Sequence, residues 1–349
     1  MSRANLLTGC VIASRPSDTI DLADLSSLIA FCYPADFTPP PQALNFVFPE
    51  LPDVCDFETF FVVTFATPAG VLFGHTLRTT SHTVCLFSNF CCDALFRPML
   101  RQTSDIYATH PLHLEDYLQQ HVASPPPDTL AQTPVDIPPS VLVEKLSVSQ
   151  IVILCSALIA ERHIIVVGSH YDSLTSFVSA LINLLHPLSY PHTLVTLLPH
   201  AFRDIVELPT PYIIGMSAEL FATFAGFTNK VLIVNLDTGA VQSNDTKMIN
   251  DDVNLIPPKA LDTLKISLQS AQTEPPDVLK TLISGYFQNF VMQLIQDPVR
   301  FLVHGKKGWS FDHRRYVKAY VKKTNAKNVA NGPHRSHAVH QFFHSHRRV

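Results

Sequence analysis

Short continuous apolar runs alternate with longer helical repeats through the middle of this chain. The runs that predict strands are residues 163–168, 193–198, 212–214 and 231–235. Strands this uniformly apolar are typical of a parallel sheet that is covered on both faces. Between the first two runs, the spacing of apolar residues predicts a helix that ends near Leu185. The pattern therefore predicts a βαβ unit, whose crossover should be right-handed.

An apolar helix is expected just before the first of these strands. Ser147 and Gln150 have the spacing of a capping box, in which each side chain satisfies a backbone N–H of the other residue. The residues that follow, through Ala160, are almost all apolar, so this helix should be buried on every side. The apolar run is too short to cross a bilayer, and it ends at Glu161.

The first part of the chain has a strand-rich pattern that ends in a proline-rich segment. Two runs of β-forming residues flank Pro68-Ala69-Gly70 and predict an antiparallel hairpin. The pattern then becomes helical from Phe90 to roughly Val122. Residues 124–140 contain six prolines, a density that cannot continue a helix or a central strand. We therefore expect an extended, semi-rigid spacer and a domain boundary at this segment.

The last part of the chain is predicted to be helical and basic. From Pro276 to Ile295, apolar residues recur on one helical stripe, so this helix must dock onto the rest of the protein. Ser310-Phe311-Asp312 predicts the start of a basic helix through Lys323. Of the 25 Lys and Arg residues, eleven lie within 304–349, where Asp312 is the only acidic residue. This basic end predicts contact with an anionic membrane surface, and a solvated face that binds nothing is the alternative.

Composition indicates a folded protein of a reducing compartment. Hydrophobic residues make up 46% of the chain and charged residues 15%, which is enough apolar material for two cores and too little charge for a disordered protein. The seven cysteines are odd in number and irregularly spaced, as expected of free thiols. The first twenty residues lack the uninterrupted apolar core of a signal peptide. We expect a soluble, cytoplasmic protein.

Sequence motifs for covalent chemistry and for nucleotide binding are missing. Neither the P-loop pattern nor G-x-G-x-x-G occurs, and Gly168-Ser169 lacks the second glycine of a nucleophile elbow. The histidines of the tail could form pairs on one helical face, but no Cys or carboxylate lies nearby to complete a zinc site. Their partial protonation and contact with anions is the favoured interpretation. We therefore expect no cofactor, no metal, no catalytic residues and no nucleic-acid partner.

Polar residues gather where the predicted strands end. In an open α/β sheet, the crevice beyond the carboxyl ends of the strands is the usual binding edge. The candidate partner-binding residues are Ser169, Asp172, Ser173, Thr175, Pro211, Tyr212 and Asp237. The alternative is that these side chains are structural: Asp172 or Ser173 would cap a helix, and Asp237 would close a turn. In the same way, the nearby Arg162 would pair with a carboxylate.

Several blocks in this region resemble the DENN domain family, in the family's order and at its intervals. Residues 154–185, LCSALIAERHIIVVGSHYDSLTSFVSALINLL, match its run of apolar helix, Glu-Arg, buried strand and serine-rich helix start. The blocks HPLSYPHTLVTLLP, PTPYIIGMS and VLIVNLDTG follow. FCYP and FFVVTFATPAGVLFGHTL resemble the family's upstream module, and SGYFQNFVMQLIQDPVRFL and FDHRRYVKAYVKK resemble its downstream helices.

The resemblance implies a bilobal α/β protein. Residues 1–123 would form a longin-like lobe, an antiparallel sheet with helices, and residues 124–140 the proline-rich linker. Residues 141–256 would form the central αβα module, a parallel sheet wrapped by helices. Residues 257–349 would form the downstream helical module with its basic tail.

The family's usual activity is guanine nucleotide exchange on Rab GTPases, so the resemblance implies a Rab-type small GTPase as partner in vesicle trafficking. The GTPase would dock across both lobes, and the protein would be recruited peripherally to membranes from the cytoplasm. Two alternatives remain open. A GTPase-activating protein of longin-DENN type would need an arginine finger, for which Arg78, Arg97 and Arg101 are candidates. A non-catalytic GTPase or membrane adaptor is the other.

Overall fold

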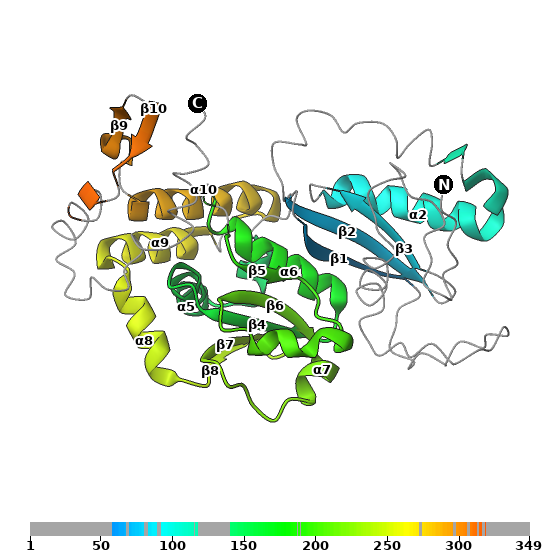
Figure 1. Cartoon of the computed structure of the whole chain (residues 1–349), viewed down its shortest axis with the longest axis horizontal. Coiled ribbons are helices and arrows are strands. Elements are labelled where there is room, and N and C mark those ends of the chain that lie inside the picture. The colour runs from blue at the N-terminus through cyan, green and yellow to red at the C-terminus, as the bar shows by residue number, and fades with distance from the viewer. Residues whose placement is uncertain are drawn as a thin grey trace.

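The computed structural model describes residues 58–67, 70–79, 83–88, 92–114, 116–117, 140–186, 188, 190–271, 274–295, 298–305, 308–312, 314–315 and 318. Within them, a three-stranded antiparallel sheet and a five-stranded mixed sheet lie side by side, and helices cover both (Figure 1). The family-like FCYP block, the proline-rich spacer except Ser140, and the histidine-rich tail lie outside the described residues.

The antiparallel sheet confirms the predicted hairpin. Its strands are β1 (Glu58–Thr67), β2 (Gly70–Thr79) and β3 (Thr83–Ser88), in the order β1-β2-β3. Thr67 pairs with Gly70, so the chain reverses where the proline–glycine signal predicts it. Helix α2 (Asp93–Thr109) packs against β2 and β3, and a 3-10 turn, η2 (Pro111–His113), follows it. The helix is shorter than predicted because Pro111 disfavours helical geometry at His110, which has φ −140°.

The second sheet contains four parallel strands and a fifth, antiparallel strand, which corrects the prediction of a wholly parallel sheet. Its strands are β4 (His163–Gly168), β5 (Thr193–Val195), β6 (Tyr212–Ser217), β7 (Val231–Asn235) and β8 (Ala240–Ser243), in the order β5-β6-β4-β7-β8. The first four are parallel, and β8 is antiparallel to β7. A tight turn with Gly239 at φ +67° reverses the chain and causes this pairing.

The helices of this half are α4 (Ser140–Lys145), α5 (Val148–Ile159), α6 (Tyr171–Asn183), α7 (Ala218–Ala222), α8 (Thr246–Leu255), α9 (Pro258–Ala271) and α10 (Pro276–Ile295), with the 3-10 segment η3 (His200–Glu207). The capping box at the start of α5 is confirmed, since Ser147 Oγ accepts from Gln150 N and Gln150 Oε1 from Ser147 N. The apolar stripe of α10 is also confirmed: Ile283, Phe287, Phe290, Val291 and Leu294 are buried.

The end of the described chain differs from the prediction. A 3-10 turn, η4 (Pro298–Phe301), leads into a hairpin of β9 (Leu302–Gly305) and β10 (Gly308–Phe311). Ser310 and Phe311 therefore belong to a strand, because they pair with Val303 and Leu302, and do not open a helix. Helical geometry begins after Asp312, whose Oδ1 accepts a hydrogen bond from Arg315 N. The predicted continuation to Lys323 lies mostly outside the described residues.

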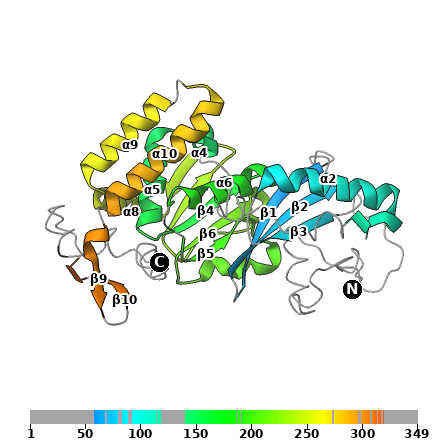
Figure 2. The ribbon, with the colours of Figure 1, turned by 90° about the horizontal axis from the view of Figure 1, so that it is seen from above.

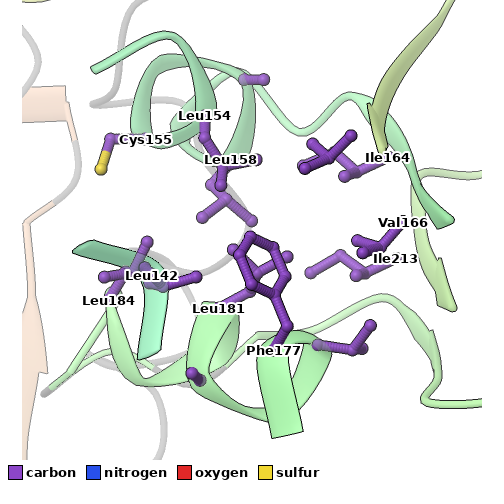
Figure 3. Packing of buried hydrophobic residues seen from close by; sticks show 14 of the residues in the cluster. Leu142, Leu154, Cys155, Leu158, Ile164, Val166, Phe177, Leu181, Leu184 and Ile213 are labelled. Carbon is purple, nitrogen blue, oxygen red and sulfur yellow. The ribbon is translucent and has the colours of Figure 1, made fainter. Parts of the chain in front are cut away.

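One apolar core holds the five-stranded sheet and its helices together. Figure 3 shows Leu142 of α4, Leu158 of α5 and Phe177 of α6 meeting Ile164 and Ile213 of the sheet. The core also includes residues of the antiparallel sheet: Phe61, Val62, Val63 and Phe73. Figures 1 and 2 agree that α6 lies between the two sheets, beside β1. The two sheets therefore pack as one body through this shared core.

Three threonines join the neighbouring edges of the two sheets, β1 and β5. Thr64 Oγ1 donates to Leu194 O (2.9 Å), and Thr196 Oγ1 donates to Val62 O (2.5 Å). Thr175 Oγ1 of α6 accepts from Val62 N (3.2 Å). Backbone groups at a strand edge must find partners when they are buried. Here side-chain hydroxyls take the place of a backbone hydrogen-bond ladder between β1 and β5. Thr196 N donates to Thr64 Oγ1 (3.4 Å), so β5 ends at Val195 rather than at the predicted residue 198.

Replacement of Thr196 by valine should measure what this joint contributes. The substitution keeps the shape of the side chain but leaves Val62 O buried without its donor, so we expect a loss of about 1–3 kcal/mol in the free energy of unfolding, measured in urea. Thr196→Ser retains the hydroxyl and is expected to lose clearly less. Equal losses in both variants would show that packing of the methyl group, not the hydrogen bond, matters here.

Candidate functional site

The carboxyl ends of β4 and β7 bring two of the candidate residues together. Ser169 follows β4 directly, and Asp237 follows β7 by two residues. The Asp237 carboxylate accepts from Ser169 N (3.0 and 3.2 Å) and from Ser169 Oγ (2.8 Å). Both residues are exposed. The side chain that closes the turn after β7 is Asn235, whose Oδ1 accepts from Asp237 N and Thr238 N, so the Asp237 carboxylate is left to hold Ser169.

Neither Asp172 nor Ser173 caps α6, although the structural alternative predicted that one of them would. The N-cap residue is His170, which makes no side-chain cap hydrogen bond, and Asp172 and Ser173 are already inside the helix. The Asp172 side chain turns instead toward α2 of the other sheet. Its Oδ1 accepts from Arg97 Nη2 (2.5 Å) and its Oδ2 from Arg97 Nη1 (3.1 Å).

Arg97 bridges two carboxylates, one on its own helix and one on α6. Its Nε and Nη2 also donate to Asp93 Oδ2, one helical turn earlier, at 3.0 and 2.9 Å. Burial acts to lower the pKa of Arg97, but the hydrogen bonds and charge of Asp172 and Asp93 outweigh it and raise that pKa. The guanidinium carbon lies 5.0 Å from the centre of the Phe60 ring on β1. Arg97 thus contacts elements of both sheets.

One face of α6 is directed at the antiparallel sheet. Thr175 lies three residues after Asp172, on the same helical face, and is 1% exposed. Its hydroxyl accepts from Val62 N, as described above, and Tyr171 packs edge-on against Phe61 with ring centroids 5.7 Å apart. Asp172 and Thr175 therefore lie at the joint of the two sheets. Of the other two candidates in this stretch, Ser169 is exposed and Ser173 is half-buried.

The other two candidates, Pro211 and Tyr212, lie at the opposite end of the sheet. Tyr212 begins β6 and neighbours His163 at the start of β4, whereas Ser217 at the end of β6 pairs with Gly168. Five residues of strand separate the two edges by roughly 16 Å. Tyr212 is also fully buried, with its hydroxyl donating to Val206 O at 3.0 Å. Burial raises the pKa of this hydroxyl. The structure therefore does not bring Tyr212 to the surface or to Ser169 and Asp237.

Arg162 pairs with a carboxylate, which confirms the structural role predicted for it. Its Nε donates to both oxygens of Asp252 on α8, each at 3.0 Å, and its Nη2 to Oδ1 at 2.6 Å. The Asp252 side chain is 2% exposed. Sequence reasoning did not find this acidic partner, nor the roles of Asp93 and Thr196. The one signal available was the spacing of Asp93 and Arg97, which suits an ion pair on a helix.

Within the described residues, the positions of metal-ligating side chains, thiols and apolar helices in the fold bear on three other functions: metal binding, thiol chemistry and membrane insertion. Among them, no three His, Cys, Asp or Glu side chains are grouped in a way that could hold a metal ion. Cys92 and Cys155 are buried and form no disulfide, and burial raises the pKa of Cys155 to about 12, so it stays protonated at neutral pH. No helix in the described ranges is long and apolar enough to span a membrane.

Comparison with known proteins identifies this region. Residues 128–239 match the model of the DENN (AEX-3) domain. DENN domain-containing protein 2B of Mus musculus is 27% identical over 192 residues, which cover 51% of this chain and 17% of that protein. DENN domain-containing protein 2D of Homo sapiens is 26% identical over 194 residues, 54% of this chain and 40% of that protein. Myotubularin-related protein 5 of Caenorhabditis elegans is 29% identical over 106 residues, 30% of this chain and 6% of that protein.

The matched part spans less than half the length of each of these relatives. It includes the end of β4, the first turn of α6 and the end of β7, where Ser169, Asp172 and Asp237 lie. The order of apolar helix, Glu-Arg, buried strand and next helix that resembles the family is the order that the structure shows for α5, β4 and α6. Residues 128–239 thus match the DENN domain, and the chain is similar to DENN domain-containing proteins.

Proposed function

We propose that this protein is a guanine nucleotide exchange factor for a Rab-type small GTPase in vesicle trafficking. The observation that carries the proposal is the DENN domain match over residues 128–239. The proposal extends to the division of the chain into an upstream lobe (1–123), a linker (124–140), a central module (141–256) and a downstream module (257–349). In it, the β1–β3 sheet with α2 is the longin-like lobe, and the protein is cytoplasmic and recruited peripherally to membranes.

Exchange on a GTPase requires binding energy rather than covalent chemistry. A small GTPase holds its nucleotide through Mg²⁺, a P-loop and ordered switch loops. The exchange factor must bind the loosened or empty GTPase more tightly than the loaded one, because a ligand shifts an equilibrium only by its differential affinity. A thousandfold acceleration of GDP release needs about 4 kcal/mol of such a difference. A regulator of this kind has no catalytic residues of its own.

The surface proposed to contact the GTPase is the carboxyl edge of the five-stranded sheet. Ser169 and Asp237 are exposed there and hold each other in place, and Ser173 lies on the next helical turn. Thr175 and Tyr212 are buried, so in the proposal they support this surface from within. Asp172 retains 47% exposure but is engaged by Arg97. Pro211, at the amino edge, is half-buried and is proposed as a separate contact.

The proposal is tested by measuring the release of fluorescent GDP from a panel of purified Rab proteins. We expect one or more of them to lose GDP at least about tenfold faster with the unaltered chain. Asp237→Ala removes the acceptor that holds Ser169 and is expected to lower that acceleration about tenfold, without unfolding the protein. Asp262→Ala, on the exposed side of α9, is the control and should release GDP as fast as the unaltered chain.

Other outcomes of the same assay would contradict an exchange function. Faster GTP hydrolysis with unchanged GDP release would indicate the GTPase-activating role. Of the arginines considered for that role, Arg97 is held by two carboxylates, and Arg101 is the more exposed, at 59%. Binding that alters neither rate would indicate an adaptor. If Asp237→Ala leaves the rate of GDP release unchanged, the GTPase contacts a different surface of the molecule.

A further inference from the structure

We infer that Arg97 is a positioning residue that sets the orientation of the antiparallel sheet relative to the carboxyl edge of the five-stranded sheet, so that one GTPase can engage both. This inference rests on the proposed exchange function and deepens it. Arg97 lies where three elements meet: α2, which carries it, β1, whose Phe60 ring lies beneath it, and α6, whose Asp172 accepts two of its hydrogen bonds.

The chemistry of this joint requires an arginine. The guanidinium is a planar fork with donors at Nε, Nη1 and Nη2, and all three nitrogens are used. The Nε side faces Asp93 on the same helix, while the two Nη atoms face the two oxygens of Asp172. This arrangement fixes the rotation of α2 about its axis as well as its distance from α6. A lysine, with one compact ammonium group, could not hold both carboxylates in this geometry.

The placement of Asp172 and Thr175 supports the same conclusion. They are three residues apart on α6, and each accepts a hydrogen bond from the half of the protein that contains the antiparallel sheet. Asp172 accepts from Arg97 of α2, and Thr175 accepts from Val62 N of β1. The first bond is half-exposed and the second is buried. A half-exposed ion pair contributes little to stability. A small displacement of contact groups can nevertheless change a rate by about a hundredfold, so orientation is the property that this pair controls.

The surface that this joint would hold in register has two parts. On α2, the exposed positions share one helical face and are Ala94, Pro98, Arg101, Gln102, Asp105, Ala108 and Thr109. Their spacing of three, four and seven residues forms a stripe along the helix. The second part is the pair Ser169 and Asp237 beyond α6. The inferred GTPase-binding surface includes both parts, with Asp172 serving as the internal anchor between them.

A charge swap distinguishes an anchor from a direct contact. Arg97→Asp places a second carboxylate against Asp172, and Asp172→Arg places two arginines together, so each single variant should slow exchange, roughly tenfold to a hundredfold. The double variant again has one arginine between two carboxylates, since Asp93 is retained. We expect it to recover exchange to within about threefold of the unaltered chain. If Asp172 touched the GTPase directly, the double variant would stay as slow as the single ones, which would overturn the positioning role.

A second readout needs no GTPase. Amide hydrogen exchange of Val62, whose N–H donates to Thr175 beside the joint, should be faster in both single variants and protected again in the double variant. Unchanged protection of Val62 in Arg97→Asp would also overturn the inference. The control is Arg203→Asp, an exposed arginine on η3 whose guanidinium carbon lies 5.1 Å from the Phe224 ring centre, and it should change neither readout.

Failure of the exchange function would be recognised separately. If the unaltered chain accelerates GDP release from no Rab protein, the exchange function and the inference that rests on it both fall. If the unaltered chain is active and only the rescue fails, the exchange function stands and the role of Arg97 is refuted.

Discussion

Replacement of Gly215 by alanine is expected to abolish stable folding, the largest effect of any single substitution considered for this protein. Gly215 lies in the middle of β6, which is hydrogen-bonded to β4 on one side and to β5 on the other. An added Cβ would overlap the carbonyl oxygen of Thr196 and lie 2.9 Å from its carbonyl carbon. Because these atoms belong to the backbone, a change of side-chain rotamer cannot relieve the clash. We expect a loss of about 4 kcal/mol or more in the free energy of unfolding.

The chain offers a matched control for this substitution. Gly285 lies within α10 and is exposed, and apart from its chain neighbours and its own helix backbone no atom lies within 4 Å of the position that a Cβ would take. Gly285→Ala should therefore stabilise the protein by about 0.5–1 kcal/mol, since alanine is the better helix former. Both variants can be compared by urea unfolding or, for Gly215→Ala, by soluble yield. A Gly215→Ala variant as stable as the unaltered chain would mean that the Thr196 carbonyl does not approach Gly215 as closely as described.

Replacement of Arg162 by methionine is expected to cost about 3–5 kcal/mol at neutral pH, because it leaves the buried Asp252 carboxylate without its partner. The pair of Lys230 and Asp245 gives the control. The Lys230 side chain is 70% exposed, so Lys230→Met should cost clearly less than Arg162→Met. Urea unfolding of both variants measures the difference. Similar losses in the two would show that burial of Asp252 does not control the strength of the pair.

The loss in Arg162→Met should shrink as the pH is lowered. Burial raises the pKa of Asp252 above its ordinary value of 3.8, although the Arg162 hydrogen bonds act to lower it. A carboxyl group whose folded-state pKa is raised binds more protons when folded, so stability falls as pH rises through that pKa. Without Arg162, the pKa of Asp252 should rise further. Protonation would then remove the buried charge at mildly acidic pH, so the gap between the unfolding curves of the variant and the unaltered chain should be smaller at about pH 5 than at about pH 7.5.

The parts of the fold that sequence reasoning predicted are those set by neighbouring residues. The capping box of Ser147 and Gln150 depends on a spacing of three residues, and the β1–β2 hairpin on a local turn. The strands β4 and β7 were predicted at their observed bounds because both are short apolar runs with buried faces. Helix α8 was missed because its sequence, TKMINDDVNL, has few apolar residues and is held by Asp252 and Arg162, which are distant in sequence.

The candidate site was predicted less completely, because it depends on which strand ends share an edge. Ser169 and Asp237 do share one and are hydrogen-bonded, whereas Tyr212 begins its strand and is buried. A sequence shows that a polar residue borders an apolar run, but the direction of the strand in the sheet decides at which edge it lies. The hydroxyl of Tyr212 satisfies Val206 O inside the protein, which is why a polar aromatic residue is found there.

The sequence by itself determined the β1–β2 hairpin, the capped helix α5 and the strands β4 and β7, because apolar period, capping and turn signals act over a few residues. Only the tertiary structure decided that α6 would be the joint between two sheets, with Arg97 held between Asp93 and Asp172 and Thr196 bonded to Val62. The partners of the last two contacts are 75 and 134 residues apart. Such pairings follow from how complete elements pack, and no local pattern specifies them.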